Sequence, residues 1–373
     1  MPTSYRPKAL LLIPHLGGGG AERVMAELAR GLDGEKYEIH LGLVTGDERG
    51  GEKLPAGVRV HALGAGRVRS GAGRVLGLIW RLRPQVILSG MYHLNFLVLL
   101  MRPIFPVGTR VLVRQNGSVS AALSFGGQPF YTRLFYRVLY RRADRVLCQS
   151  AAMAEDLAEE FGIDRKRLAV VPNPVDVEAI RASLNAEQAP WNGPGPHLLA
   201  VGRLSREKGF DLLLEALVRI RAKFSTADLL IVGTGVEEAR LKAERSRLGL
   251  DDAVRFVGHQ DCPWSYFGGA TVFVLSSRHE GMPNALLEAA AAGLPLVTTP
   301  ASGGVVELLG LQPGAWLAEG ISAEALVAAL LCALRSLRPG ERFAHGFMDG
   351  FKMDRAIKEY EQVIDGCLRE KRR

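Results

Sequence analysis

Two glutamates, eight residues apart, lie in the segment whose residue types point most clearly to chemistry. Residues 272–292, VFVLSSRHEGMPNALLEAAAA, combine an apolar run, a polar loop with Glu280 and an alanine-rich stretch with Glu288. Glycine lets backbone approach a ligand closely, and proline near a helix start loses no intrahelical hydrogen bond. The positive N-terminal end of such a helix suits hydroxyls and phosphate. The two carboxylates can accept hydrogen bonds from sugar or ribose hydroxyls. For Glu288, the alternative is an acid that only complements the helix dipole.

A second candidate set is a pair of cations five residues apart. Arg203 and Lys208 lie in VGRLSREKGF, on the expected loop between a strand and a helix. A guanidinium fork and an ammonium group so placed can neutralise a diphosphate without a metal ion. Considered alone, each is equally explained as a surface charge. Because the sequence contains no D-x-D pair to bridge a metal, we expect metal-independent chemistry and no metal site.

Glycine clusters follow two of the expected strands. Residues 17–20 can cradle a phosphate, so Gly18 and Gly19 are candidate phosphate contacts, although such a cluster is more often a plain turn. The pattern does not match the G-x-G-x-x-G of a dinucleotide site. The cluster Gly233-Thr234-Gly235 is interpreted as a turn between a strand and a helix.

The elements that must position these residues alternate between short apolar runs and helix-length segments, which is typical of parallel sheets with right-handed crossovers. In the N-terminal half, strands are expected at 8–13, 39–44, 58–62, 85–88, 110–113, 145–148 and 168–171. Amphipathic helices are expected at 21–32 and 131–142. Residues 185–196, NAEQAPWNGPGP, have the composition of a linker.

The same alternation restarts after the linker. Strands are expected at 198–201, 229–232, 254–257, 272–275 and 294–298, and helices at 210–224, 237–248, 285–291 and 323–337. Ile357, Tyr360, Ile364 and Leu368 recur at helical spacing and predict a final amphipathic helix. The sequence therefore predicts two doubly wound domains in tandem. Ligands bind beyond the carboxyl ends of such strands, so two facing domains create a cleft.

Together these segments resemble the family-4 retaining glycosyltransferases of the GT-B fold, whose signature is a Glu-x7-Glu segment like that of Glu280 and Glu288. Residues 202–209 resemble the family's loop that grips the donor diphosphate, and GGGGAERV at 17–24 resembles its first glycine-rich loop. The segment NPVD at 173–176 matches the one before the linker, and FKMDRAIKEYEQVI resembles the terminal helix that crosses back. The resemblance covers nearly the whole chain.

The resemblance implies an α/β architecture of two Rossmann-like domains facing a central cleft. Residues 1–185, completed by a C-terminal helix at 352–370, would bind the acceptor, and residues 196–350 would bind the nucleotide sugar. Arg203 and Lys208 would hold the donor phosphates, Glu288 the ribose, and Glu280 the transferred sugar near its reacting carbon. Backbone groups of Gly281, Met282, Pro283 and Asn284 would orient that sugar, and Gly18 and Gly19 would contact the donor. No cofactor is expected, because the nucleotide sugar is a substrate.

The implied reaction retains the configuration of the anomeric carbon. The leaving phosphate can accept the acceptor's proton on the same face, while Arg203 and Lys208 stabilise the developing negative charge. No protein nucleophile is then required.

The chain departs from the family pattern at a histidine that many family members carry after the strand at 110–113, where this chain has VLVRQNGSVS. Arg114, Gln115 and Asn116 are the acceptor-side candidates, whereas His15 and His93 lie in other loops and are interpreted as surface residues.

Positive charge is concentrated in one stretch of the chain. Residues 54–150 contain fourteen arginines, no lysine and one acid, Asp144, a net charge of +13; because the whole chain carries +8, the rest carries −5. Such asymmetry indicates an anionic partner or, alternatively, a solvated surface. In YTRLFYRVLYRRADR at 131–145, Leu134, Val138 and the aromatics can share one face, with Arg133, Arg137, Arg141 and Arg142 on another. We hypothesise docking on an anionic membrane to receive a lipid-linked acceptor; an ordinary core helix is the alternative.

Composition narrows the class and location. A chain of 373 residues with 47% hydrophobic content suggests two folded domains. The four scattered cysteines suggest a reducing cytosol, and no run is long enough to span a membrane. We therefore expect a cytoplasmic enzyme or one peripheral on the cytoplasmic membrane face. A UDP-sugar is favoured over GDP-mannose. The alternatives are a nucleotide-sugar epimerase and a non-catalytic anion- or nucleic-acid-binding protein; no nucleic-acid motif accompanies the arginines, so no nucleic-acid partner is expected.

Overall fold

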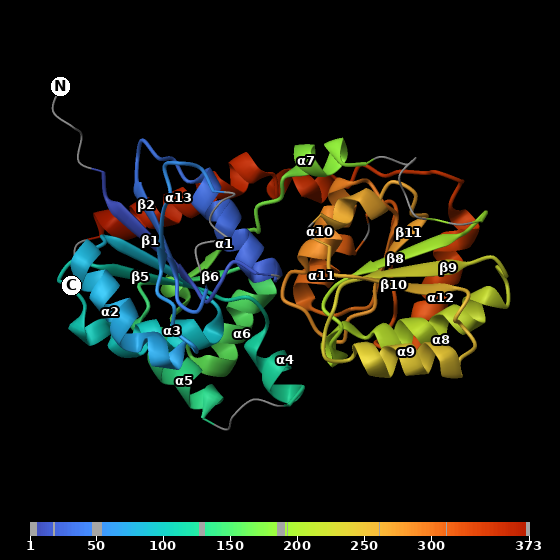
Figure 1. Ribbon diagram of the computed structural model, residues 1–373, viewed down its shortest axis with the longest axis horizontal. Helices are drawn as coiled ribbons and strands as arrows, with labels where there is room; N and C mark the ends of the chain where they lie inside the picture. Colours follow the sequence, from blue (N-terminus) through green and yellow to red (C-terminus); the bar gives the residue numbers. More distant parts are fainter. Residues whose placement is uncertain are drawn as a thin grey trace. The chain divides into compact units, whose positions relative to one another are not determined.

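The computed structural model describes residues 6–17, 19–46, 54–126, 131–184, 191, 193–260, 262–310 and 312–370. It divides into two units: unit 1 comprises Met1–Pro174 and Met353–Arg373, and unit 2 comprises Val175–Lys352. Each unit is built on one parallel sheet with helices on both faces (Figure 1). The α/β class and the doubly wound sheets expected from the sequence are confirmed.

The sheet of unit 1 has seven strands in the order β3-β2-β1-β4-β5-β6-β7, and all neighbouring pairs are parallel. Leu10 and Leu12 on β1 contact one apolar cluster, whereas Leu11 and Ile13 contact another. This alternation arises because successive side chains of a strand point to opposite faces, so a buried parallel strand is apolar throughout. The strands are β1 (Lys8–Ile13), β2 (Glu38–Leu43), β3 (Arg59–Ala62), β4 (Val86–Gly90), β5 (Arg110–Arg114), β6 (Arg145–Cys148) and β7 (Leu168–Val170).

Two helix layers cover this sheet. One layer comprises α2 (Ala72–Leu82), α3 (Tyr92–Met101), α5 (Thr132–Leu139) and α6 (Ala151–Phe161), and the short α4 (Val119–Ser124) adds Val119 to it. The other layer comprises α1 (Gly20–Gly31) and the C-terminal α13 (Met353–Arg369). Helix α13 buries Ile357, Tyr360 and Ile364 in that cluster, so the end of the chain completes the core of unit 1.

The sheet of unit 2 has six strands in the order β10-β9-β8-β11-β12-β13. Its strands are β8 (His197–Val201), β9 (Asp228–Val232), β10 (Val254–Gly258), β11 (Val272–Leu275), β12 (Leu296–Thr298) and β13 (Ala315–Leu317). Helices α8 (Phe210–Arg221), α9 (Glu238–Arg247) and α12 (Ala323–Ser336) pack on one face. Helices α7 (Val177–Ala182), α10 (Asn284–Ala291) and α11 (Gly303–Leu309) pack on the other. The strand order reverses between β8 and β11, which are hydrogen-bonded neighbours.

Every strand predicted from the sequence exists, but three details differ. Strand β13 was not predicted, because three residues at a sheet edge carry no periodic signal. The helix predicted at 131–142 ends as α5 at Leu139 and continues as a 3₁₀ turn, Tyr140–Arg142. Leu134 and Val138 do not share a face with Tyr136 and Tyr140, since the former pair is exposed and the latter pair is buried.

The predicted domain boundary at residue 185 also lies too far along the chain. The units divide between Pro174 and Val175, so α7 belongs to unit 2. The physical reason is packing: Val177 and Ile180 join the apolar cluster of unit 2, and the Val175 N–H donates to the Phe351 carbonyl at 2.8 Å. Composition identified a polar linker, but the boundary between the units comes earlier in the chain, before the buried side chains of α7.

Candidate active site

The predicted cations and glutamates lie at one end of the sheet of unit 2. Strands β8 and β11 run parallel, with Leu198 paired to Val272. The loop after β8 carries Arg203 and Lys208, and the loop after β11 carries Glu280. Both loops leave the carboxyl ends of the strands between which the strand order reverses, the position at which open α/β sheets bind ligands. Sheet topology therefore brings together residues separated by more than seventy positions in the chain.

An ion pair joins the two loops. Lys208 Nζ lies 2.6 Å from Glu280 Oε1, with 23% and 10% of the respective side chains exposed. Ser277 Oγ donates to the same Oε1 at 2.6 Å, and the Glu280 N–H donates to the Ala301 carbonyl at 2.9 Å. The Glu280 carboxylate is thus fixed through one oxygen and through its backbone. Its other oxygen, Oε2, takes part in neither of these side-chain bonds.

Arg203 is held differently. Its side chain is exposed and forms no hydrogen bond or ion pair with any residue that the structure describes. The Arg203 carbonyl accepts from the N–H of Ser205 at 2.9 Å and from Ser205 Oγ at 3.3 Å. A guanidinium on an ordered backbone with no internal partner can bind an anionic ligand without first breaking an ion pair.

Arg278, which sequence reasoning did not single out, clamps the two loops together. Its guanidinium pairs with both oxygens of Asp211 at 2.7 and 2.8 Å and also donates to the Arg206 carbonyl at 3.0 Å. Its own N–H donates to the Glu207 carbonyl at 2.7 Å. Arg278 lies two residues before Glu280 in the sequence, but its pairing with Asp211 spans 67 positions and left no local signal.

Glycines let three loops approach closely at this edge. A Cβ on Gly209, whose φ is +63°, would lie 2.0 Å from the Ser276 carbonyl oxygen. A Cβ on Gly233 would lie 2.0 Å from the Gly202 carbonyl oxygen. A Cβ on Gly235 would lie 2.2 Å from the Leu204 carbonyl oxygen. The cluster at 233–235, interpreted from sequence as a plain turn, therefore also supports the loop that carries Arg203.

The segment predicted to orient a sugar leads into α10. Gly281, Met282 and Pro283 are buried, Asn284 is the first helical residue, and no side chain caps the helix N-terminus. Ser302 Oγ donates to the Gly281 carbonyl at 2.9 Å and fixes the approach to the helix. Glu288 lies inside α10 with only 6% of its surface exposed. The Glu288 carboxylate is therefore shielded from bulk solvent.

His279, beside Glu280, is a further ionisable group that the sequence analysis did not select. Burial lowers the pKa of His279, although the nearby carboxylates of Glu280 and Glu207 act in the opposite direction. For Glu207, burial would raise the pKa, but a hydrogen bond from Ser205 and the charge of Lys208 bring it below its ordinary value. At neutral pH the His279 imidazole is therefore neutral, and the Glu207 carboxylate on the loop after β8 is ionised.

The acceptor-side candidates lie in unit 1 and differ in exposure. Arg114 is 1% exposed; its guanidinium donates to Tyr360 at 3.1 Å and also bonds Asn116 and Asn173. Gln115 is buried and accepts from the Tyr140 hydroxyl at 2.8 Å. Arg114 therefore does not present a charge to solvent: it ties the end of β5 to α13. Asn116 is the partly exposed member of the set.

A second group lies at the carboxyl ends of β1 and β4, the switch point of the unit 1 sheet. His15 follows β1, and His93 is in the first turn of α3 after β4. Burial lowers the pKa of His93, and the nearby His15 lowers it further. Met91 between β4 and α3 has a φ of +84°, and Asn116 Nδ2 lies 3.8 Å from its sulfur. Left-handed backbone at a residue other than glycine is concentrated at functional sites.

The glycine-rich loop after β1 is described in part. Gly18 lies outside the described residues. Gly19 precedes α1 in an extended conformation, φ −118° and ψ 155°, and the carboxylate of Glu22 occupies the space that a Cβ on Gly19 would enter. The buried Glu22 thus lies against this turn, so an acid in the first helical turn faces the predicted phosphate-binding backbone.

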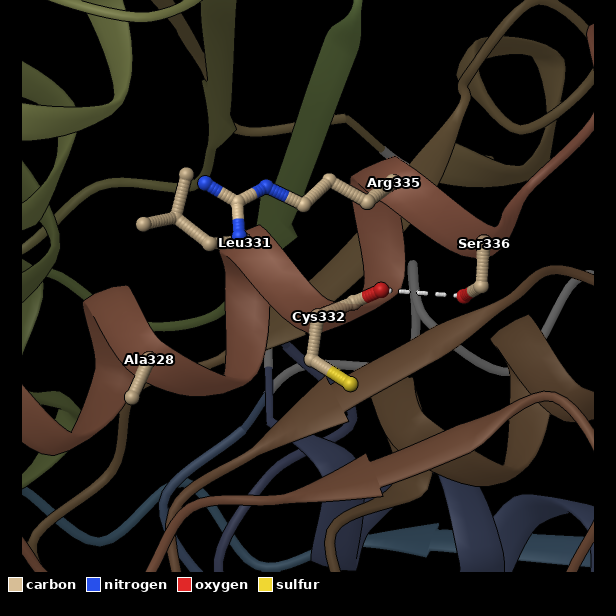
Figure 2. A pocket seen from close by; sticks show the side chains of 5 residues that line it. All are labelled: Ala328, Leu331, Cys332, Arg335 and Ser336. Carbon is tan, nitrogen blue, oxygen red and sulfur yellow. Dashed lines mark hydrogen bonds between the residues drawn. The ribbon is translucent and has the colours of Figure 1, made fainter.

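Two other findings bear on the site. Among the described residues, no group of three or more histidine, cysteine, aspartate or glutamate side chains could hold a metal ion. A pocket of about 440 Å³ lies on α12, lined by five residues of that helix, Ala328, Leu331, Cys332, Arg335 and Ser336 (Figure 2). Ser336 Oγ donates to the Cys332 carbonyl there at 2.9 Å. This pocket contains none of the predicted site residues.

Two family models match the sequence. One, described as Glycosyltransferase Family 4, matches residues 18–179, and the other, described as Glycosyl transferases group 1, matches residues 195–336. A curated Campylobacter jejuni protein, N-acetylgalactosamine-N,N'-diacetylbacillosaminyl-diphospho-undecaprenol 4-alpha-N-acetylgalactosaminyltransferase, is 27% identical over 312 residues, 80% of this chain and 82% of that protein. Seven further curated relatives are matched over 35% to 60% of their own length.

Solved structures match nearly the whole chain. Sucrose-phosphate synthase from Thermosynechococcus elongatus has a TM-score of 0.81 and 18% identity, covering 97% of this chain and 99% of that one. HepE of Anabaena in complex with UDP and glucose has a TM-score of 0.76 and 17% identity, covering 97% and 100%. At these identities the structural likenesses establish the fold.

Gly209→Ala tests whether the close approach of the loops after β8 and β11 stabilises unit 2. Its Cβ would meet the Ser276 carbonyl, so we expect a lower thermal unfolding midpoint. The matched control is Gly249→Ala, because Gly249 has a φ of +67° but nothing within 4 Å of a Cβ. The control should lose only the backbone cost of about 1–2 kcal/mol. Equal midpoints for the two variants would contradict the steric role of Gly209.

Proposed function

The chain belongs to the family-4 glycosyltransferases of the GT-B fold, and on that basis we propose that it transfers a sugar from a UDP-sugar to a lipid-linked acceptor, in the synthesis of a surface polysaccharide or glycoconjugate. The complex of HepE with UDP and glucose supports the choice of nucleotide. The name of the Campylobacter jejuni relative specifies an acceptor on diphospho-undecaprenol, which supports the lipid-linked acceptor.

The observation that carries the proposal is the cation and carboxylate group at the β8 and β11 switch point. Lys208 is 2.6 Å from Glu280, and the exposed Arg203 lies on the same loop as Lys208. A UDP-sugar carries a diphosphate beside a ring of hydroxyls, so its binding requires cations next to hydrogen-bond acceptors. Arg203 and Lys208 meet the first requirement, and Glu280 and Glu288 meet the second.

In the proposed reaction, the bond between the anomeric carbon and the leaving phosphate breaks as the acceptor hydroxyl attacks from the same side. The departing phosphate oxygen takes the acceptor's proton, and Arg203 and Lys208 stabilise the negative charge that develops on the diphosphate. Glu280 accepts hydrogen bonds from the transferred sugar, while the uncapped N-terminus of α10 orients it. This sequence of events requires no protein nucleophile, metal ion or cofactor, and it retains the anomeric configuration.

On the acceptor side, we propose that the hydroxyl is received near Asn116 and His93. Asn116 is partly exposed beside Met91, and the lowered pKa of His93 keeps its imidazole neutral and able to accept a hydrogen bond. Arg114 and Gln115 support this region from the core instead of contacting the acceptor. The group then performs the positioning that a histidine after β5 performs in many family members.

Arg203→Ala tests the donor-phosphate role. We expect kcat/KM for sugar transfer to fall by roughly 100-fold or more, because removal of one preorganised donor of this kind costs about 10²–10³ in rate. Arg247→Ala is the control: Arg247 is exposed on α9 and pairs with Glu244 three residues away. Transfer should be measured with and without acceptor, since turnover of the UDP-sugar that needs no acceptor would indicate an epimerase. Equal activity of the Arg203 and Arg247 variants would remove the assignment.

Glu280→Gln separates binding of the sugar from binding of the nucleotide. The neutral amide attracts Lys208 less strongly than the carboxylate does, so Lys208 can contact phosphate more readily. We therefore expect UDP affinity by calorimetry to stay equal or increase, while the rate of transfer falls by about 100-fold. A variant that loses UDP affinity and keeps its rate at saturating donor would show that Glu280 acts on the nucleotide and not on the sugar.

We also propose that α5 docks on an anionic membrane surface. No described helix is long and apolar enough to cross a bilayer. On the outer face of α5, Tyr131, Leu134 and Val138 are 44%, 58% and 48% exposed, beside the exposed Arg133 and Arg137. Exposed apolar side chains flanked by arginines are typical of interfacial helices.

Leu134→Glu tests the docking. The new carboxylate should reduce co-flotation with anionic vesicles, because it places negative charge between the helix and the lipid. Val236→Glu is the matched control, since Val236 is 91% exposed and belongs to unit 2, whereas α5 belongs to unit 1. Wild-type protein that fails to float with anionic vesicles, or a Leu134 variant that floats as wild type does, would exclude this surface.

A further inference from the structure

Unit 1 contains a pocket of about 1100 Å³ whose lining is strongly basic. Six arginines and Lys166 line it, against the carboxylates of Asp144, Asp164 and Glu370, a net charge of +4. Arg110 begins β5 and Arg145 begins β6, so the pocket lies at the amino ends of these strands. The candidate acceptor residues, such as Asn116, follow the carboxyl end of β5. A strand of five residues spans roughly 15 Å, so the pocket is separate from the acceptor region.

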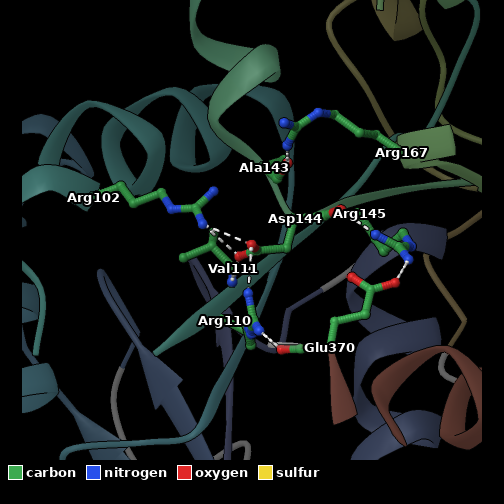
Figure 3. Close-up of polar contacts among 8 residues, drawn as sticks. All are labelled: Arg102, Arg110, Val111, Ala143, Asp144, Arg145, Arg167 and Glu370. Carbon is green, nitrogen blue, oxygen red and sulfur yellow. Dashed lines mark hydrogen bonds and ion pairs between the residues drawn. The ribbon is translucent and has the colours of Figure 1, made fainter. Parts of the chain in front are cut away.

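Part of this charge is used internally. Arg102 Nη2 donates to both oxygens of Asp144, at 2.7 Å each, and the N–H of Val111 donates to Asp144 Oδ2 at 2.7 Å (Figure 3). Arg145 pairs with the Glu370 side chain, and Arg110 donates to the Glu370 carbonyl. These contacts join β5, β6 and the end of α13 into a fixed wall. Asp144 and Glu370 are therefore occupied by arginines of the wall.

The remaining cations have no such partners. The side chains of Arg141, Arg142 and Lys166 form no hydrogen bond or ion pair within the described part of the chain, and all three are exposed. Arg167 donates to the Ala143 carbonyl at 2.6 Å, a bond that leaves its charge uncompensated. Arg142 ends the 3₁₀ turn after α5, and Lys166 lies in the 3₁₀ turn before β7. Two short ordered turns thus hold uncompensated cations at one concave surface.

We propose that this pocket is a second anion site, which binds a ligand carrying two or more phosphate groups. Like charges so close together repel one another, and a concave wall concentrates their field, so a multiply charged anion is the ligand that stabilises them most. Guanidinium groups match phosphate oxygens in pairs. A soluble oligophosphate and a phosphate-bearing lipid headgroup share this chemistry. Val107, which is 92% exposed, adds an apolar contact to the lining.

The test uses tripolyphosphate as the probe, in a protein whose donor cations are removed by Arg203→Ala and Lys208→Ala. Calorimetry should show binding that further substitution with Arg142→Glu and Lys166→Glu weakens by about tenfold or more, because each substitution replaces a cation with an acid. The matched control is Arg67→Glu with Arg69→Glu, which makes the same charge change on exposed arginines outside the pocket. If the Arg142→Glu and Lys166→Glu substitutions lower the thermal unfolding midpoint, tripolyphosphate binding is measured instead on the neutral Arg142→Gln and Lys166→Gln variants.

Absence of tripolyphosphate binding, or an equal loss in the pocket and control variants, would overturn the proposal. Vesicles with and without cardiolipin, whose headgroup carries two phosphates, identify the source of the ligand. The site is assigned to a lipid headgroup if the protein sediments with cardiolipin vesicles, if tripolyphosphate prevents this sedimentation, and if the Arg142 and Lys166 variants no longer sediment. Tripolyphosphate binding without cardiolipin-dependent sedimentation assigns it to a soluble ligand. Sugar transfer is measured separately, so a failure of this site is distinct from a failure of the donor site.

Discussion

The ion pair between Lys208 and Glu280 joins two loops that are far apart in sequence and adjacent in the sheet, and the candidate active site depends on this junction. Lys208 follows β8, Glu280 follows β11, and these two strands are neighbours at the point where strand order reverses. A partly buried pair of this kind contributes little net stability, because desolvation offsets much of the attraction between the charges. Its consequence is geometric: it fixes a cation and a carboxylate side by side where a ligand can reach both.

The junction requires backbone that approaches more closely than side chains permit. Gly209, Gly233 and Gly235 each pass against a carbonyl of a neighbouring loop, at distances that exclude a Cβ. Arg278 adds a clamp from the other side through its paired bonds to Asp211. The exposed cation, Arg203, is therefore carried on a loop that these contacts hold in place, so an anionic ligand would bind there without first ordering the loop. Preorganisation of this kind lowers the cost of binding and of stabilising developing charge.

Unit 1 uses its arginines in three different environments. Arg114 is buried and bonds three side chains, so its charge serves the packing of β5 against α13. Arg133 and Arg137 lie on the outer face of α5, and Arg142 lines the pocket at the amino ends of the strands. The net charge of +13 in residues 54–150 is thus divided among separate places in the fold. The three environments correspond to core packing, to the surface proposed to dock on anionic lipid and to the proposed second anion site.

The sequence by itself determined the α/β class and nearly every strand. It also singled out the candidate site residues, Arg203, Lys208, Glu280 and Glu288. These features are local: strand runs are apolar because both faces of a parallel strand are buried, and loops at strand ends carry their chemistry within a few residues. The edge strand β13 and the exact end of the helix at 131–142 were missed because short edge segments and 3₁₀ turns carry weak periodic signals.

Only the tertiary structure decided which side chains meet. Lys208 pairs with Glu280 across 72 positions of the sequence, and Arg278 pairs with Asp211 across 67. The buried Arg114 bonds Tyr360 across 246 positions. The position of α7 in unit 2 likewise follows from Val177 and Ile180 packing into a core built from later strands. Local residue patterns specify strands, helices and loops, but partners distant in sequence are set by strand order and packing, which no short segment encodes.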